Sequence, residues 1–425
     1  MPTVLHNFWL LLAVLIGVIF LAYLAWRRLD LAGAIVLFLA PLYLLKIVSL
    51  PLTVLELLLL ILIFVWLLKR WRERHLLIFL RGLDFFSWWL PVILLLAGFF
   101  FATMSSADIR VSAGIFKSWL VEPIVFGLFL ADTIITKKHF KNLCWAMILS
   151  GVSVALISLG YAVFGYLTFD GRLSAFYLSP NHLAMYLAPA LILAIGFWFE
   201  GVSTRLKFFL FASCFVLLLS LFFTLSYAAW LSVFAALTFL VVCLRRQRTI
   251  SFKKFLVFSL SVLVLCSVLF ISQRSNQKIN DLFNSDRSSW QSRLTIWRAA
   301  EKILADRWLV GIGPGLFQKY YLEYQKYFPP YLEWAVPQPQ NLFLAFWLQT
   351  GLIGLTGFIW LIISFFRWAF AAIKEKKSPL AMVLAAIMIY FLAHGLVDTT
   401  YWKNDLALVF WTVIALSYRV GRWNG

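Results

Sequence analysis

Residues 87–104 read SWWLPVILLLAGFFFATM, a run of mostly apolar side chains without a charged one. A helix of roughly 20 apolar residues crosses the hydrocarbon core of a bilayer. Helices also satisfy their own backbone hydrogen bonds, which lipid requires. The ten-residue alternation of a membrane β-barrel is absent from the sequence. This stretch therefore predicts a membrane-spanning helix and sets the fold class for the rest of the chain.

Similar runs extend from one end of the chain to the other. The 425 residues are 63% hydrophobic, with a mean hydropathy of +0.91, whereas soluble domains are about 45–50% apolar. We therefore expect an all-α, polytopic transmembrane bundle with thirteen spans, or with twelve because few residues separate the two halves of 31–68. The expected spans are 8–26, 31–48, 52–68, 87–104, 115–134, 140–160, 182–199, 206–224, 226–244, 254–272, 342–366, 380–397 and 404–420.

The charge pattern predicts the orientation of these spans. The formal net charge is +19, and its basic clusters are scattered between spans rather than gathered on one face, which argues against a nucleic-acid partner. A single alternating topology places them all on one side, which the positive-inside rule makes cytoplasmic. The clusters lie at 27–28, 69–74, 137–141, 205–207, 245–254, 374–377 and 419–422.

The connections on the other side include one long polar segment. We divide the chain into transmembrane helices at 1–272, an extracytoplasmic loop domain at 273–341 and C-terminal transmembrane helices at 342–425. Within the loop domain, SRLTIWRAAEKILADRWL (292–309) repeats apolar residues at helical spacing, which predicts an amphipathic helix. Its predicted apolar face consists of Leu294, Trp297, Leu304 and Trp308. The glycines of GIGPG (311–315) lack the ending of a phosphate loop and predict a tight turn.

The sequence offers no signature of a metal site or a cofactor. The four cysteines lie within apolar runs, and CxxC and HExxH spacings are absent. We therefore expect neither a structural disulfide nor a bound metal.

One candidate constellation is RLSAFYLSPNHLA (172–184). Asn181 precedes an apolar run, which is typical of a helix cap, and a helix start can also bind an anion. Arg172, just before it, would reinforce such an anion site. His182 fits either a buried hydrogen-bonding role or titration near neutral pH.

Other polar residues occur at membrane depth or in the outward connections. Glu122 stands inside a span, where an ionisable residue is either a functional candidate or half of a salt bridge. Arg293 and Arg298 lie on the predicted amphipathic helix, and arginine binds diphosphate oxygens bidentately, although surface ion pairs would explain most arginines of this loop. Asp398, between the last two spans, is a candidate base or part of a local salt bridge.

The stretch PQPQN (337–341) stands where the loop domain returns to the membrane. Gln338 and Gln340 can bind sugar hydroxyls but cannot act as bases near neutral pH. Asn341 is placed to cap the following span.

Four blocks together resemble the O-antigen ligase and O-antigen polymerase family of polytopic glycan transferases. They are RLSAFYLSPNHLA (172–184), RLTIWRAAEKILADRWLVGIGPGLF (293–317), PQPQNLFLAFWLQTGLIGL (337–355) and HGLVD (394–398). Their order, the long loop between the second and third blocks, and the number of spans agree with the family. The resemblance extends from about residue 105 to the end of the chain.

The resemblance implies an enzyme of envelope polysaccharide or lipopolysaccharide biosynthesis in the bacterial plasma membrane. It implies a glycan donor carried on polyprenyl (undecaprenyl) diphosphate, and a hydroxyl acceptor on a glycan, lipid or protein at the outer face. It implies inverting transfer without a metal or cofactor. By the same resemblance, Arg172 matches the arginine before the PN block, and Arg293 opens the R-x-x-x-W helix whose tryptophan is Trp297; both would hold the carrier diphosphate.

The chain departs from the family pattern at two positions. Gln340 stands where the family often has a histidine, and Tyr227 stands where it often has the arginine of a Ser-Arg-Gly motif. The first departure removes the usual activator of the acceptor, which leaves Asp398 and His182 as candidate bases. The second removes one diphosphate-binding cation. A ligase, a polymerase, a transporter of lipid or glycan and a non-catalytic scaffold all stay open at this point.

Overall fold

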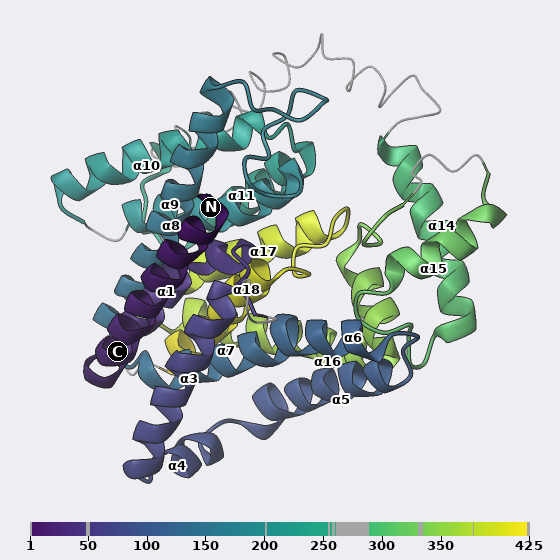
Figure 1. Ribbon diagram of the computed structural model, residues 1–425. Coiled ribbons are helices and arrows are strands. Elements are labelled where there is room, and N and C mark those ends of the chain that lie inside the picture. The colour runs from purple at the N-terminus through teal and green to yellow at the C-terminus, as the bar shows by residue number, and fades with distance from the viewer. Residues whose placement is uncertain are drawn as a thin grey trace.

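The computed structural model describes residues 2–47, 52–199, 202–253, 256, 260, 289–329, 335–376 and 378–422 (Figure 1). Within these residues the chain is built from helices, and its β-type pairing is one isolated bridge between Lys46 and Thr53. The expectation of an all-α bundle is confirmed.

The described helices follow one another along the chain with short connections before residue 253. In chain order they are α1 (Pro2–Arg27), α2 (Leu29–Phe38), the 3-10 turn η1 (Ala40–Leu44), α3 (Val54–Arg72), α4 (Leu76–Arg81), the π-helical turn η2 (Phe85–Trp89), α5 (Leu90–Met104), α6 (Ile109–Ile115), the π-helical turn η3 (Phe116–Val121), α7 (Glu122–Thr133), α8 (Lys137–Val163), α9 (Pro180–Trp198), α10 (Thr204–Phe223), α11 (Tyr227–Arg246), α14 (Ser289–Arg307), α15 (Phe317–Tyr324), the 3-10 turn η4 (Gln325–Tyr327), α16 (Leu342–Lys376), α17 (Pro379–Gly395) and α18 (Asn404–Arg422).

Among the described residues, seven helical stretches are long and apolar enough to cross a membrane, which confirms a polytopic membrane protein. The expected span 254–272 lies outside the described residues, so the count of thirteen stays a prediction. The expected span 31–48 was wrong in its extent, because α2 ends at Phe38 and η1 follows. The seven stretches are Phe85–Met104, Ile109–Thr133, Lys137–Val163, Pro180–Trp198, Thr204–Phe223, Tyr227–Arg246 and Leu342–Glu375.

The centre of the bundle is formed by α9, α17 and α18, whose side chains are almost all buried. Figure 1 shows α17 and α18 between the group α8–α11 and the pair α5 and α16. Small residues permit the close approaches. Gly98 of α5 lies against the backbone of Gly354 of α16, where any side chain would collide. Such contacts stabilise helix pairs in lipid, where burial of apolar surface provides little force.

The long helix α16 is broken at Gly351, whose backbone has φ 66° and ψ −174°. In an unbroken helix the amide of Leu352 would bond to the carbonyl of Leu348. Instead the Leu352 amide donates to the carbonyl of Leu309 at 3.0 Å, and the Leu348 carbonyl accepts from the amide of Ile312 at 2.6 Å. The segment 309–312 therefore occupies the break. The predicted span 342–366 lies within the candidate span Leu342–Glu375, which this break interrupts.

Residues 289–329 and 335–341 surround a second, smaller hydrophobic core. The predicted amphipathic helix is confirmed as α14, but its predicted apolar face was partly wrong, because Trp308 is 52% exposed. The glycines of the predicted turn have positive φ, between 79° and 92°, which a glycine adopts without strain. The face of α14 that is buried consists of Ile296, Ala299, Ala300, Ile303 and Leu304.

Candidate functional site

The loop between α17 and α18 receives side chains from two helices that are distant in sequence. Arg293 of α14 donates from Nε to the carbonyl oxygen of Val397 at 2.8 Å. Asn341, at the start of α16, donates from Nδ2 to the carbonyl oxygen of Leu396 at 2.9 Å. The Oδ1 of Asn341 also accepts from two amides in the first turn of α16, at 3.0 Å each. Asn341 is therefore the predicted cap and also a link to this loop.

The next residue of the same loop joins a third helix and a second arginine. Asn181 of α9 donates from Nδ2 to the carboxylate of Asp398 at 2.8 Å, and its Oδ1 accepts from the guanidinium of Arg172 at 2.7 Å. Arg172 also donates from Nε to the carbonyl oxygen of Thr224 at 2.8 Å. Both ionised groups are largely buried, with Arg172 13% and Asp398 9% exposed. The three residues form one chain of hydrogen bonds.

The two arginines lie close enough to influence one another. Burial is the largest effect on Arg172 and lowers the pKa of its guanidinium; the charge of Arg293 lowers this pKa further. The carboxylates of Asp170, 3.9 Å away, and Asp398 act in the opposite direction. Two arginines beside each other are suited to an anion with several oxygens. The first and second sequence blocks therefore meet in space, as expected of a shared anion site.

Asn181 is not the cap of α9, so that interpretation of it was wrong. The side chain of Ser179 accepts from the amide of His182 at 3.2 Å and caps the helix instead. The amide of Asn181 is thereby available to Arg172 and Asp398.

The two positions that depart from the family pattern also lie at this site. Tyr227, the first residue of α11, is among the groups that act electrostatically on Arg172. Gln340 is half-buried and has a left-handed backbone with φ 48°. It follows Pro339, whose carbonyl oxygen accepts from the indole of Trp297 at 3.1 Å. A non-glycine residue with positive φ costs of order 1–3 kcal/mol and is often retained at functional sites.

Gln338 and Arg298 are placed differently. Gln338 accepts through Oε1 from the amide of Gln349 at 2.8 Å, and Gln349 accepts in turn from the backbone of Gly315 at 2.9 Å. Gln338 thus ties the re-entering chain to the glycine turn. Arg298 is exposed on α14.

His182 is buried in the bundle rather than beside the arginines. Its Nε2 lies 3.2 Å from the carboxylate of Asp405, at the start of α18. The imidazole packs against the ring of Tyr177, with ring centres 4.4 Å apart, and is 3% exposed. This surrounding suits the buried hydrogen-bonding role more than acceptor activation.

Glu122 belongs to a different group of helices. Its side chain is 4% exposed and lies 3.8 Å from Nζ of Lys117, which also lies 3.0 Å from the carboxylate of Glu56. Glu56 closes a capping box with Thr53 at the start of α3. Glu122 therefore has the salt-bridge role that the sequence left open.

Two groups at the site were not singled out from the sequence. His394, in the last turn of α17, is fully buried, and its Nδ1 lies 2.9 Å from the hydroxyl of Tyr390. The charges of Asp398 and Arg293 both act on it, so it lies close to the site. The carbonyl of Thr224 is the other group, and a main-chain acceptor leaves no signal in a sequence.

Residues 212–359 match the sequence model of a family described as O-antigen ligase. The matched range includes Arg293, Tyr227 and Asn341, whereas Arg172 and Asp398 lie on either side of it. None of the curated proteins matches the chain.

Proposed function

Because residues 212–359 match the O-antigen ligase family, which supports an O-antigen ligase or polymerase, we propose that the chain transfers an oligosaccharide or polysaccharide from a polyprenyl diphosphate to a hydroxyl acceptor. The family supports a lipid-linked glycan transferase in general. The proposal adds the donor, the mechanism and the residues. The observation that carries it is that two part-buried arginines reach the same loop: Arg293 directly, and Arg172 through Asn181.

The proposed site faces the extracytoplasmic side of a bacterial plasma membrane. Helix α18 begins beside the site. It has 19 residues and is therefore roughly 28 Å long, which is close to the thickness of a bilayer core. At its far end Arg419 donates to the carbonyl of Asp132, whose carboxylate binds Arg70. Basic clusters that the sequence assigns to the cytoplasm thus meet at the end opposite the site.

The proposed reaction is a single displacement. An oxygen of the acceptor hydroxyl attacks the anomeric carbon, the bond from that carbon to the diphosphate oxygen breaks, and its electron pair stays on the diphosphate. Arg172 and Arg293 stabilise the charge that develops there, which supplies much of the catalysis. Fixed positions of donor and acceptor supply more.

The acceptor hydroxyl loses its proton during transfer, so a base must accept this proton. Asp398 is the better of the two candidate bases, because it stands within the arginine network whereas His182 is paired with Asp405 in the interior. Diphosphate is a good leaving group, so strong base catalysis is helpful rather than essential. This explains how Gln340 can stand in place of a histidine.

The test is release of polyprenyl diphosphate by the purified protein from a polyprenyl-diphosphate oligosaccharide with an acceptor present. The double variant Arg172→Ala/Arg293→Ala should lose transfer while the protein still folds. Arg307→Ala, which removes an exposed arginine of the same helix, is the matched control and should retain transfer. Undiminished turnover by the double variant would overturn the proposal.

Ligase and polymerase activities share this chemistry and differ in the acceptor. Mass analysis of the product separates them, since repeated units on one carrier identify a polymerase and a single transfer to lipid or protein identifies a ligase.

A further inference from the structure

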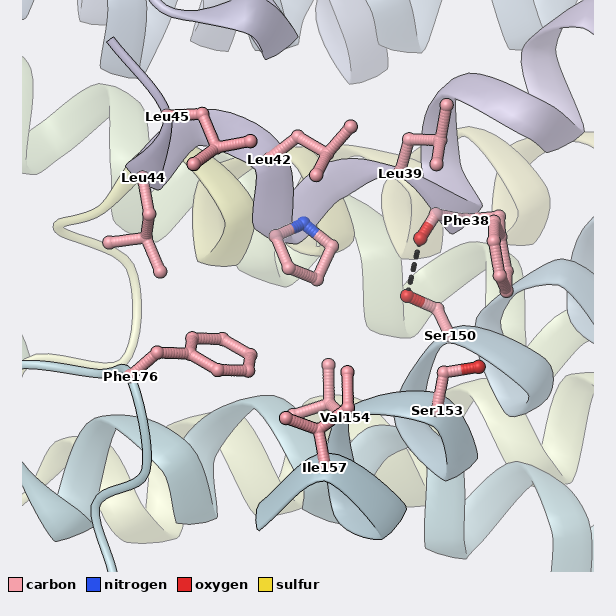
Figure 2. A pocket seen from close by; sticks show the side chains of 11 residues that line it. Phe38, Leu39, Leu42, Leu44, Leu45, Ser150, Ser153, Val154, Ile157 and Phe176 are labelled. Atoms are coloured by element: carbon pink, nitrogen blue, oxygen red, sulfur yellow. Dashed lines mark hydrogen bonds between the residues drawn. The ribbon is translucent and has the colours of Figure 1, made fainter. Parts of the chain in front are cut away.

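An apolar groove of about 430 Å³ lies between η1 and α8 (Figure 2). Two serines are the polar residues of its lining, and the lining holds no charged side chain. In Figure 2 the ring of Phe176 points into the space between Leu44 and the α8 residues Val154 and Ile157. The lining residues are Phe38, Leu39, Pro41, Leu42, Leu44, Leu45, Ser150, Ser153, Val154, Ile157 and Phe176.

The groove exists because a helix stops part-way through the bundle. α2 ends at Phe38 after ten residues, and Pro41, which has no amide hydrogen, opens η1. The carbonyl oxygen of Phe38 accepts from the hydroxyl of Ser150 at 2.6 Å, and this hydroxyl also meets the hydroxyl of Tyr186 at 2.7 Å. The Phe38 carbonyl at the end of α2 is therefore hydrogen-bonded, and an apolar groove remains beside α8.

One wall of the groove belongs to the loop that carries Arg172. On this wall, Phe176 belongs to the short loop before α9 and stands four residues after Arg172. From Ser150 to Ile157 the groove follows α8 for roughly 10 Å.

We propose that this groove holds the carrier-proximal part of the donor's isoprenoid chain, and that Phe176 makes the site select lipid-linked over soluble diphosphates. The inference rests on the proposed function. The cationic site and the uncharged groove share the loop of Arg172 and Phe176, which suits one molecule with an anionic head and a hydrocarbon tail. Phe176 is the residue that the groove shares with the Arg172 loop, so a chain in the groove also packs against this loop and fixes its position.

The choice of an isoprenoid over a phospholipid acyl chain follows from covalent continuity. The chain in the groove must be attached to the diphosphate that Arg172 binds, and only a prenyl diphosphate joins the two. In lipid the groove gains little from burial of apolar surface, so the fit of side chains against the bound chain decides affinity. Filling the groove should therefore be harmful even though the added side chain is apolar.

The experiment compares donors that carry the same oligosaccharide on a long polyprenyl diphosphate and on methyl diphosphate, which has no isoprenoid chain to place in the groove. Ile157→Trp fills the groove, and Ile359→Trp places the same side chain on an exposed face of α16 as a control. Ile157→Trp should raise KM for the long-chain donor roughly tenfold and leave KM for the methyl diphosphate donor unchanged. Phe176→Ala, which adds no volume, should likewise reduce the preference for the long chain.

A binding measurement keeps the inference testable if transfer itself fails. Wild-type protein should bind long-chain polyprenyl diphosphate without a sugar, and Ile157→Trp should bind it more weakly than Ile359→Trp does. Equal effects of Ile157→Trp on both donors, or equal binding by the two tryptophan variants, would overturn the groove assignment. So would a photoreactive phospholipid that labels Ile157 and is not displaced by polyprenyl diphosphate. Absence of transfer by wild-type protein with binding intact would instead overturn the proposed function alone.

Discussion

Asn181 accepts a hydrogen bond from the guanidinium of Arg172 and donates one to the carboxylate of Asp398, at 2.7 and 2.8 Å. A guanidinium can only donate and a carboxylate can only accept, so a residue between them must do both. A side-chain amide does this with fixed geometry. Asn181 therefore positions both side chains and prevents Arg172 from forming a direct ion pair with Asp398.

Replacement of Asn181 should lower the rate of transfer more than donor affinity. Asn181→Asp would add a carboxylate that pairs with Arg172 and repels Asp398, and we expect kcat to fall by at least about tenfold. Asn181→Ala should lower kcat less, because it removes the link without adding charge. Steady-state kinetics with one donor at several concentrations provides the measurement. An Asp variant with wild-type kcat would show that the amide is not needed to position the pair.

Gln340 offers a test of acceptor activation at the position where related proteins often have a histidine. Gln340→His would place an imidazole, with an ordinary pKa of about 6.5, beside the second block. If it acts as a base, only its neutral form is effective, so kcat should rise as the pH increases through this range. The wild-type protein has no such group at 340 and should lack this added step in its pH profile.

A second change at the same residue separates backbone from side chain. Because Gln340 has φ 48°, Gln340→Gly should relieve strain and raise stability by up to about 1 kcal/mol. Transfer should nevertheless fall if the amide binds a sugar hydroxyl. Thermal unfolding in detergent and transfer rates on the same preparation give both quantities. A glycine variant with full activity would remove Gln340 from the substrate site.

The parts of the fold that sequence predicted depend on local pattern. The apolar runs, the amphipathic α14 and the cap at Asn341 follow from residues within one or two helical turns. The family blocks predicted that Arg172 and Arg293 would share a site, and both bind the Asp398 loop or its neighbour Asn181.

What sequence could not predict depends on partners that are remote along the chain. The pairing of Asn181 with Asp398 joins residues 217 positions apart, and no spacing rule connects them. His182 and Asn181 are adjacent, yet one is drawn into the bundle by Asp405 and the other reaches the site. The break in α16 could not be predicted either, because the backbone groups that form hydrogen bonds at the break belong to the segment 309–312.

Because α16 is broken at Gly351, two glycine-to-alanine substitutions should change the stability of the protein in opposite directions. Gly351→Ala would put a side chain into a left-handed conformation and against the backbone of Leu309 and Val310, at a cost of about 2–4 kcal/mol. Gly114→Ala, in the exposed α6 with open space around it, should instead raise stability by up to about 1 kcal/mol. Thermal unfolding of the two variants in the same detergent measures the difference. Equal melting temperatures would mean that the segment 309–312 is not held at the break.

Replacing Ser150 and Ser153, one turn apart on α8, tests whether the Ser150 side chain stabilises the end of α2. Ser150 is 2% exposed and supplies the hydrogen bond that the Phe38 carbonyl needs. Lipid offers no replacement donor, so Ser150→Ala should cost about 1–3 kcal/mol. Ser153→Ala alters a hydroxyl on the lining of the same groove and should change stability by less than about 0.5 kcal/mol. Equal stabilities would show that α2 stops at Phe38 because of Pro41 alone. A loss confined to Ser150→Ala would show that this hydrogen bond stabilises the end of α2, which forms part of the groove wall.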